Sequence, residues 1–284
     1  MITIAFSGAL ELGLIYGLVA LGVYLTFRVI NFPDLTVDGS FPLGAAVVAG
    51  LLIHGIHPII ATLVAVLAGA LAGVVTGYLH VRLRVMGLLA GILTMTALYS
   101  VNIRIMGRPN IALLNVDTLF SGNFSPLIIL SGIVIFILLI IGRFLLSEYG
   151  LALRASGSNP RLSRAYGINV NTTIIITLAI SNALVSLAGA LFAELQGFAD
   201  VSLGAGTLIT GLASVIIGEA ILFTRNIMGR VFACLLGAIV FRIAIAFALN
   251  SGSLGLQASD LNLLTALLII MTLMIPRFRN LIVR

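Results

Sequence analysis

Acidic and amide side chains inside strongly apolar stretches are the residues of this sequence with the most chemistry to offer. Asp34 and Asp38 stand against an apolar run, and Asn182 and Glu219 fall within two others. A charged group at the centre of a bilayer costs roughly 2.5–3.5 kcal/mol, so such side chains must face protein, water or one another. They could line a transport pathway, or they could hydrogen-bond neighbouring helices.

The sequence leaves both roles open for each of these residues. Hydrogen bonding between helices is the favoured reading for Asn102 and Asn182. Glu219, within Gly-Glu-Ala, could face a pathway or could be held by a cation such as Arg225, one to two turns on. The candidate residues for a translocation pathway are Asn31, Asp34, Asp38, Asn182 and Glu219.

Other kinds of chemistry find no support in the sequence. His54 and His57 close one apolar run and His80 stands alone, with acids distant in sequence, so we predict capping or interfacial histidines and no metal site. Cys234 lies in an apolar run and is the single cysteine, which predicts a packing role. No Walker motif and no nucleophile elbow occurs, so we predict neither an ATPase nor a hydrolase in this chain.

The composition is that of a membrane protein. Hydrophobic residues make up 61% of the chain, charged residues only 8%, and the mean hydropathy is +1.24, whereas soluble domains carry roughly 25% charged residues. With 284 residues and about 20 residues per span, the chain has room for on the order of eight to ten transmembrane helices. We therefore predict one all-α, polytopic transmembrane domain over residues 1–284, with the lipid bilayer as its surroundings.

The charge distribution orients this bundle. All 15 basic residues are arginines and the net charge is +6, but they lie in short loops between apolar runs, so we read them as orientation signals and expect no nucleic acid partner. The first apolar stretch lacks a cleavage pattern and reads as a retained helix. Keeping the arginine-rich loops cytoplasmic places the N-terminus outside and the C-terminus inside.

The nine predicted spans are 4–27, 35–53, 59–79, 86–106, 126–146, 170–195, 207–224, 231–249 and 261–275.

The start of the second span is irregular. Residues 31–42 place two prolines, a glycine and two aspartates against an apolar run. Such backbone is tolerated at membrane depth only where protein or a watery cavity satisfies its polar groups, so we predict a broken second helix beside a pathway. The alternative is an ordinary cytoplasmic loop with its aspartates in water and Pro42 in the first turn of the next helix.

The longest basic loop, residues 148–168, contains the signals of a short helix. Asn159 suits the N-cap, Pro160 the first helical position and Gly167 the stop, which predicts about two turns outside the membrane. A capped helix between two spans could dock a partner. Composition alone would equally make this a solvated loop that follows the positive-inside rule.

This loop also carries a resemblance. The residues Gly150, Arg154, Ala155, Gly157, Asn159, Ala165, Gly167 and Ile168 form a pattern that resembles the cytoplasmic coupling loop of ATP-binding-cassette (ABC) importer permeases of the branched-chain amino acid and ribose class. The segments 17–23 and 211–218 are similar to other parts of that family, and the resemblance covers about the whole chain. Residues 31–40 resemble a bacterial subgroup described as uncharacterised or as aromatic amino acid transporters. Glu219 replaces the second glycine of a pair common in the wider family.

The resemblance implies a permease subunit of an importer in the bacterial inner membrane, with an amino acid as the favoured solute. It implies two ATPase subunits that bind ATP and magnesium, an external solute-binding protein or lipoprotein, and a second permease copy, by preference a homodimer. This chain would hold no cofactor and would catalyse no bond chemistry. The implied residues of coupling to the ATPase are Arg154, Ala155, Gly157, Asn159, Pro160, Arg161, Ala165 and Gly167.

Two other classes compete with this interpretation. A secondary transporter or channel working without ATP would have the same composition and could also use a broken helix. It fits less well because no chain of intramembrane ionisable groups is evident. A membrane-embedded enzyme would need a convergent set of acids, histidines or serines, which three dispersed histidines do not supply.

Overall fold

A computed structural model describes residues 2–122, 124–222, 224 and 226–250, together with 266, 267 and 270. The elements in chain order are α1 (Ile2–Val23), the π-helix η1 (Tyr24–Val29), α2 (Val37–Ile53), α3 (Pro58–Val81), α4 (Gly87–Met106), β1 (Asn110–Ala112), α5 (Pro126–Leu146), α6 (Glu148–Ser158), α7 (Pro160–Ala165), α8 (Val170–Gln196), β2 (Phe198–Asp200), the 3-10 helix η2 (Val201–Gly204), α9 (Thr207–Ile221) and α10 (Ile227–Asn250).

The helices confirm a polytopic membrane bundle. Within the described part of the chain, seven helical stretches are long and apolar enough to cross a bilayer, and α2 is a shorter apolar helix of 17 residues. These elements coincide with the first eight predicted spans to within a few residues. The ninth predicted span, 261–275, lies outside the described residues, so the count of nine stays a prediction.

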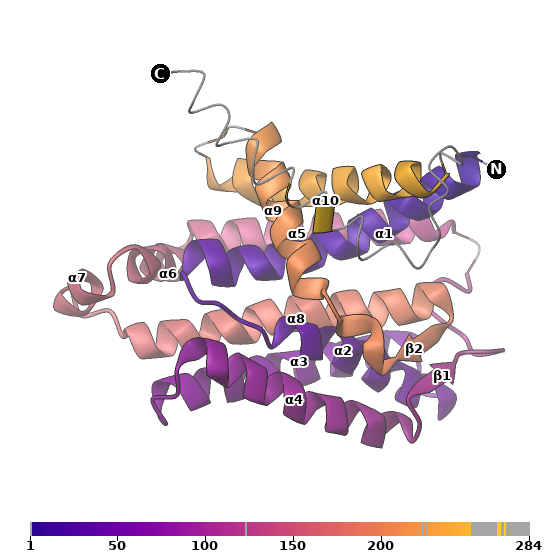
Figure 1. Cartoon of the computed structure of the whole chain (residues 1–284), viewed down its shortest axis with the longest axis horizontal. Coiled ribbons are helices and arrows are strands. Elements are labelled where there is room, and N and C mark those ends of the chain that lie inside the picture. Colours follow the sequence, from indigo (N-terminus) through magenta and orange to yellow (C-terminus); the bar gives the residue numbers. More distant parts are fainter. Residues whose placement is uncertain are drawn as a thin grey trace.

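Helix α8 occupies the middle of the bundle. Helices α2, α3 and α4 lie on one side of it, α1, α5 and α10 lie on the other, and α9 crosses obliquely toward α10 (Figure 1). One apolar core joins α1, η1, α5, α8, α9 and α10, and a second joins α2, α3, α4 and α8 with both strands. The long buried face of α8 therefore connects the two halves.

Small residues let the helices around α8 approach closely. A Cβ atom added to Gly44 of α2 would overlap the Ser186 carbonyl of α8, and one added to Gly189 of α8 would overlap the Phe41 carbonyl of α2. Because lipid gives no hydrophobic drive for helices to associate, such close backbone packing is what holds a membrane bundle together. The small residues thus fix the position of the irregular segment that precedes α2.

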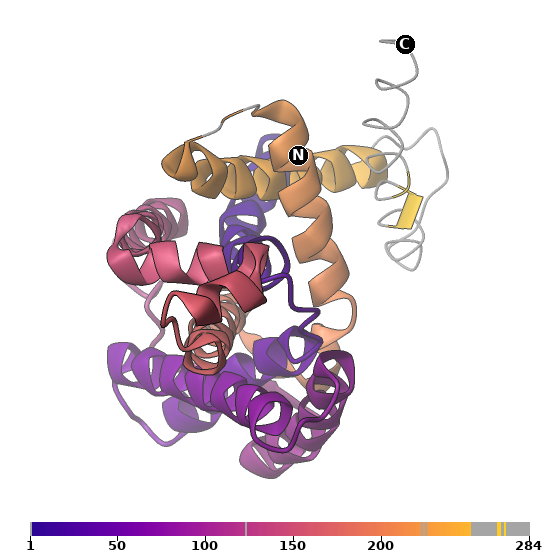
Figure 2. The same ribbon diagram turned by 90° about the vertical axis from the view of Figure 1, so that its left-hand side faces the viewer.

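The two ends of the bundle differ in character. Helices α6 and α7 project from one end, and β1 and β2 lie at the other (Figure 1). Figure 2 looks at the end that carries α6 and α7. We call it the basic end, because the loop between α3 and α4 bears Arg82 and Arg84, and α6 and α7 bear Arg154, Arg161 and Arg164. The opposite, strand end is where α1 begins.

An antiparallel strand pair closes the strand end. Asn110 faces Asp200 across the pair, and the Asn110 amide donates to the Asp200 carboxylate at 2.8 Å. Partial burial opposes ionisation of Asp200, but hydrogen bonds from Ser202 and Asn110 outweigh it and lower the Asp200 pKa. The connection from α8 to α9 is thereby tied to the loop that follows α4.

Candidate functional site

The broken second helix is present in the structure. Residues 30–36 run between η1 and α2 without regular helix. Asn31 adopts a left-handed conformation with φ 53° and is exposed, a backbone geometry that asparagine tolerates better than most residues. The chain turns here, after the wide π-helical end of the first span. Asn31 therefore has a backbone role at the break.

Asp34, in contrast, is fully buried in a hydrogen-bonded network. One carboxylate oxygen accepts the Thr36 N–H at 2.9 Å, and the other accepts the Asn182 amide N–H at 2.8 Å. The Asn182 amide oxygen in turn accepts the Ser40 hydroxyl at 2.7 Å. The expectation of an ordinary loop with its aspartates in water is therefore wrong for Asp34, because protein donors surround this carboxylate.

The network extends to a third helix. The hydroxyls of Thr36 and Thr76 lie 2.7 Å apart, and both side chains are fully buried. The break before α2 is thus tied to α3 through Thr76 and to α8 through Asn182. The predicted role of Asn182 in hydrogen bonding between helices is confirmed. Three further members of this network, Thr36, Ser40 and Thr76, were not predicted from the sequence.

Asp38 lies one turn further on and connects to α9. Its carboxylate accepts the Leu208 N–H at 2.7 Å and also bonds the backbone of Gly206. These two residues flank the start of α9, where the first N–H groups of a helix have no partner within the helix. Asp38 also lines a cavity of about 460 Å³ that α4 and η2 help to enclose. It is therefore both a helix cap and a cavity residue.

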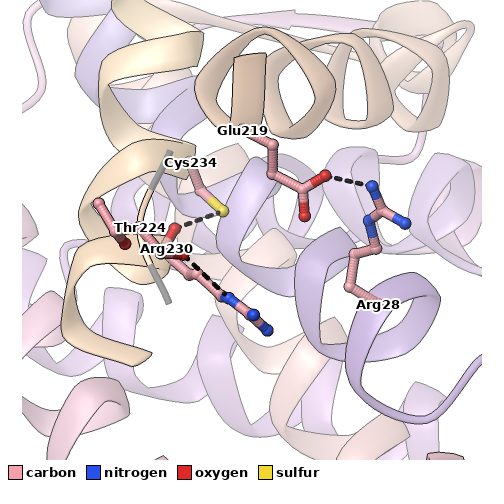
Figure 3. A network of polar contacts seen from close by, with 5 residues as sticks. All are labelled: Arg28, Glu219, Thr224, Arg230 and Cys234. Carbon is pink, nitrogen blue, oxygen red and sulfur yellow. Dashed lines mark hydrogen bonds and ion pairs between the residues drawn. The ribbon is translucent and has the colours of Figure 1, made fainter. Parts of the chain in front are cut away.

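Glu219 belongs to a different site, at the basic end. Its carboxylate forms an ion pair with Arg28 of η1, as Figure 3 shows. Arg28 and Glu219 line a cavity of about 600 Å³ together with Tyr24 and Arg230. The Arg230 Nε lies 3.5 Å from the Thr224 carbonyl oxygen. Arg28, which closes the first apolar run, is thus the partner found for Glu219. Arg225, the partner that the sequence suggested, lies outside the described residues.

The five candidate pathway residues therefore do not form one cluster. Asp34 and Asn182 are in contact, and Asp38 follows in the first turn of α2. Asn31 lies in the turn of the break, and Glu219 pairs with η1 near the far end of α9. Whether these groups face a solute pathway remains a prediction.

The predicted short helix at the basic end is present as α7. The Asn159 side chain accepts the Leu162 N–H at 3.1 Å, Pro160 is the first helical residue, and Gly167 has φ 82°. Helix α6, which precedes it, was not predicted from the sequence. Its signal was Ser147, whose side chain caps the Gly150 N–H, followed by Glu148 in the first turn.

Helix α6 packs directly on the end of the first span. A Cβ atom on Gly157 would overlap the Val29 carbonyl of η1, and Leu153 is buried in the same core as Val29. Helix α7 instead presents large side chains outward, with Leu162 54% exposed and Tyr166, its C-cap, 79% exposed. The pair of helices α6 and α7 packs on the bundle on one side and is exposed on the other.

Among the described residues, no group of three histidines, cysteines or acids could hold a metal ion.

Membrane-length helices around a broken helix, polar networks at its break and a capped helix pair outside the bundle together describe a multi-pass membrane permease. Comparison with known sequences gives the same class. Residues 5–275 match the family described as branched-chain amino acid transport system, permease component. The chain belongs to this family of ABC-type permeases.

Two relatives cover nearly the whole chain. A tyrosine transport system permease protein of Clostridioides difficile is 41% identical over 257 residues, which cover 90% of this chain and 86% of that protein. An uncharacterized protein of Rickettsia prowazekii is 35% identical over 275 residues, 93% of this chain and 95% of that one. Among solved structures, PsaBC from Streptococcus pneumoniae in complex with Fab has a similar fold, with a TM-score of 0.58 at 18% identity over 96% of this chain and 95% of that chain.

Proposed function

We propose that this chain is the membrane-spanning subunit of an ABC importer that carries an amino acid across the bacterial inner membrane. The family and the tyrosine permease relative support transport of an amino acid. Separate ATPase subunits would bind ATP and magnesium, and this chain would hold no cofactor and catalyse no bond chemistry.

The exposed face of α7 is the observation that carries the proposal. Leu162 of α7 and Tyr166, the residue that ends this helix, are large side chains at the projecting basic end, and both are mostly exposed. Exposed apolar side chains rimmed by charge mark protein contact sites, and Arg161 and Arg164 supply that charge here. An ATPase subunit docking on this face would cover them.

A rigid route leads from this face into the bundle. Displacement of α6 would reach η1 at the contact between Gly157 and Val29, because no side chain lies between the two backbones. The Arg28 to Glu219 ion pair then joins η1 to α9. The start of α9 is bonded to Asp38 of α2. Packed helices transmit small shifts as bodies, so closure of the ATPase pair would move the elements beside the break.

The assembly that we propose contains two copies of this chain around a central pathway. The basic end would be cytoplasmic, with the N-terminus outside and the C-terminus inside, since arginine-rich loops stay in the cytoplasm. A solute-binding protein or lipoprotein would deliver the solute at the strand end. One face of α4 exposes the polar side chains of Thr96, Tyr99 and Ser100 within a membrane-length helix. In the proposed assembly this face would lie against the second copy or the pathway and not against lipid.

The test is capture of the ATPase by variants of the exposed face. We expect Leu162→Glu to abolish recovery of a Walker-motif ATPase with the tagged chain from native membranes, and to abolish ATP-driven uptake after reconstitution. The matched control is Leu114→Glu, since Leu114 is 78% exposed and lies two residues after β1. Recovery of the chain alone from unaltered membranes, with uptake that needs no ATP, would instead favour the secondary transporter.

A further inference from the structure

The cavity at the basic end is lined by charged side chains from three elements. It encloses about 600 Å³, within the range of ligand pockets in proteins. Its walls come from η1, the end of α9 and the start of α10. We call it the α9–α10 cavity, and its lining residues on which the following argument depends are Tyr24, Arg28, Glu219, Thr224 and Arg230.

Arg230 brings to this cavity a guanidinium group without an acidic partner. The residue is exposed, and its Nε only approaches the Thr224 carbonyl oxygen, at 3.5 Å. The ion pair found in the described part of the chain joins Arg28 to Glu219 and leaves Arg230 out (Figure 3). A guanidinium carries five N–H donors in a planar fork that matches the two oxygens of a carboxylate. Arg230 can therefore bind an anionic group that enters the cavity.

Glu219 keeps one carboxylate oxygen free. Its Oε2 accepts a hydrogen bond from the Arg28 guanidinium, and its Oε1 has no hydrogen-bond partner among the described residues. The Glu219 side chain is 28% exposed, and Oε1 is not one of the buried polar atoms that lack a partner there. A donor that enters the cavity can therefore reach this oxygen.

Tyr24 shows that the two charged groups belong to one region of the lining. The Tyr24 hydroxyl lies beside the Arg230 guanidinium and close enough to Glu219 to be affected by its charge. Arg230 and Glu219 nevertheless form no ion pair with each other. A cation and an anionic oxygen that share a cavity without contact leave room for a ligand that carries both charges.

This arrangement favours a zwitterion over a singly charged ligand. A simple anion would be attracted by the arginines but repelled by Glu219, and a simple amine would be attracted by Glu219 but repelled by Arg28 and Arg230. An α-amino acid carries an ammonium group with three donors and a carboxylate with acceptors only, both on one carbon atom. Its two charged groups complement the free oxygen of Glu219 and the unpaired fork of Arg230.

We infer that the α9–α10 cavity is a subsite for the zwitterionic head of the transported amino acid. The carboxylate of the solute binds Arg230, and its ammonium group binds Oε1 of Glu219. The inference rests on the proposed transport function and names the solute groups that the permease itself would recognise. At the basic end, which we propose to be cytoplasmic, such a subsite would hold the solute as it leaves the bundle.

Site-directed labelling tests this without ATP or a partner. The purified full chain carries Cys234→Ala to remove its single thiol and Thr224→Cys in the cavity lining. The rate of maleimide labelling is measured with L-tyrosine, with tyramine, which lacks the carboxylate, and with 3-(4-hydroxyphenyl)propanoate, which lacks the amine. We expect L-tyrosine to slow labelling, and we expect each analogue to need at least a roughly ten-fold higher concentration for half protection, since hydrogen bonds between charged groups are strong.

A fourth probe separates the solute from a lipid headgroup. The water-soluble headgroup sn-glycero-3-phosphoethanolamine also carries an anion and an ammonium group, but these are further apart than in an α-amino acid. We expect it to protect less than L-tyrosine. Protection equal to or stronger than that by L-tyrosine would assign the cavity to a lipid headgroup and overturn the solute subsite.

Three variants assign the two roles. Arg230→Gln should raise the concentration of L-tyrosine for half protection at least roughly ten-fold, and Arg230→Lys, which keeps the charge but loses the fork, should give an intermediate value. Glu219→Gln should remove the advantage of L-tyrosine over 3-(4-hydroxyphenyl)propanoate, because only the ammonium group loses its partner. Both side chains are partly exposed, so the thermal midpoint should change by under about 3 °C.

Arg82→Gln is the matched control. Arg82 is an exposed arginine at the same end of the bundle and does not line the cavity. Its replacement removes the same charge and should change neither the protection by L-tyrosine nor the ranking of the probes. An equal loss of protection in Arg82→Gln and Arg230→Gln would reduce the effect to the general charge of the basic end and overturn the subsite.

Other results would also overturn it. These are protection by none of the probes, equal protection by L-tyrosine and either single-charge analogue, undiminished protection in Arg230→Gln, and an unchanged ranking in Glu219→Gln. ATP-driven uptake by the unaltered complex is measured in parallel. Uptake without protection refutes the subsite alone, whereas protection without ATP-dependent uptake supports the subsite and refutes the proposed importer.

Discussion

Replacement of Asn182 by leucine should show how much the buried network at the break stabilises the bundle. Leucine keeps the branched shape of the asparagine side chain, with bulkier ends, but removes the 2.8 Å bond to Asp34 and the 2.7 Å bond from Ser40. Asp34 is fully buried, so no water replaces the lost donor. The Ser40 hydroxyl can turn to a carbonyl of its own helix, which reduces its share of the loss.

The two lost hydrogen bonds differ in their contribution to the free energy of unfolding. Hydrogen bonds between membrane helices contribute about 0.6–1.7 kcal/mol each, and leaving a buried acceptor on a carboxylate unpaired costs about 1.5–3 kcal/mol. We expect a total of about 3 kcal/mol for Asn182→Leu. At about 2–4 °C per kcal/mol for a chain of this size, the thermal midpoint should fall by about 6–12 °C.

The single cysteine of the chain can report the thermal midpoint of unfolding. It contains no tryptophan and one cysteine, and Cys234 is fully buried, so a thiol-reactive fluorogenic dye reports unfolding in detergent. Thr173→Val is the matched control on α8, because the Thr173 hydroxyl bonds only the Asn169 carbonyl near the helix start. Its midpoint should move by no more than about 2 °C.

A double-mutant cycle with Asp34→Leu isolates the contact. Because Asp34 and Asn182 share a direct bond, Asn182→Leu should cost less in the background that already lacks the carboxylate. A midpoint within about 2 °C of the unaltered chain, or equal costs in both backgrounds, would refute the view that the network stabilises the break.

Three further predictions concern the basic end. Arg28→Ala should change the thermal midpoint by under about 3 °C, because the Arg28 side chain is 55% exposed and exposed ion pairs contribute about 0–1 kcal/mol. In reconstituted vesicles this variant should nevertheless lower the number of solute molecules transported per ATP hydrolysed. An unchanged ratio would contradict the route through Glu219. Asn159→Ala should weaken α7 by about 1 kcal/mol and speed hydrogen exchange there, whereas unchanged exchange would show that the cap is dispensable. Ser158→Cys should react with impermeant maleimide only from the cytoplasmic side, and reaction from outside would reverse the proposed orientation.

Local signals made much of the fold predictable. The apolar runs located the first eight spans, and the Asn-Pro start and glycine stop located α7. Each of these depends on neighbours in sequence, such as a cap three residues from its donor. Helix α6 obeys the same rules through Ser147, but its low hydrophobicity and its glycines at 150 and 157 made it read as a loop.

Partners far apart in sequence could not be predicted. Glu219 lies 191 residues from Arg28, and Asp34 lies 148 residues from Asn182. The cost of burying a polar group shows that it needs a partner but does not say which one. The partner depends on helix packing, here on close approaches such as that of Gly44 to Ser186, which no periodicity reveals.

The two aspartates at the break show why burial alone does not identify a ligand group. Asp34 is the more deeply buried, yet Thr36 and Asn182 supply a donor to each of its oxygens. A carboxylate already paired in this way gains little from a solute, since the solute would have to displace an existing bond. Asp38 is partly exposed and lines a cavity, yet its carboxylate accepts the Leu208 N–H and caps the start of α9. Acceptor capacity that remains after the bonds within the protein, more than depth, decides whether a carboxylate is available to a solute, and at the break the first aspartate is bonded to α8 and the second to α9.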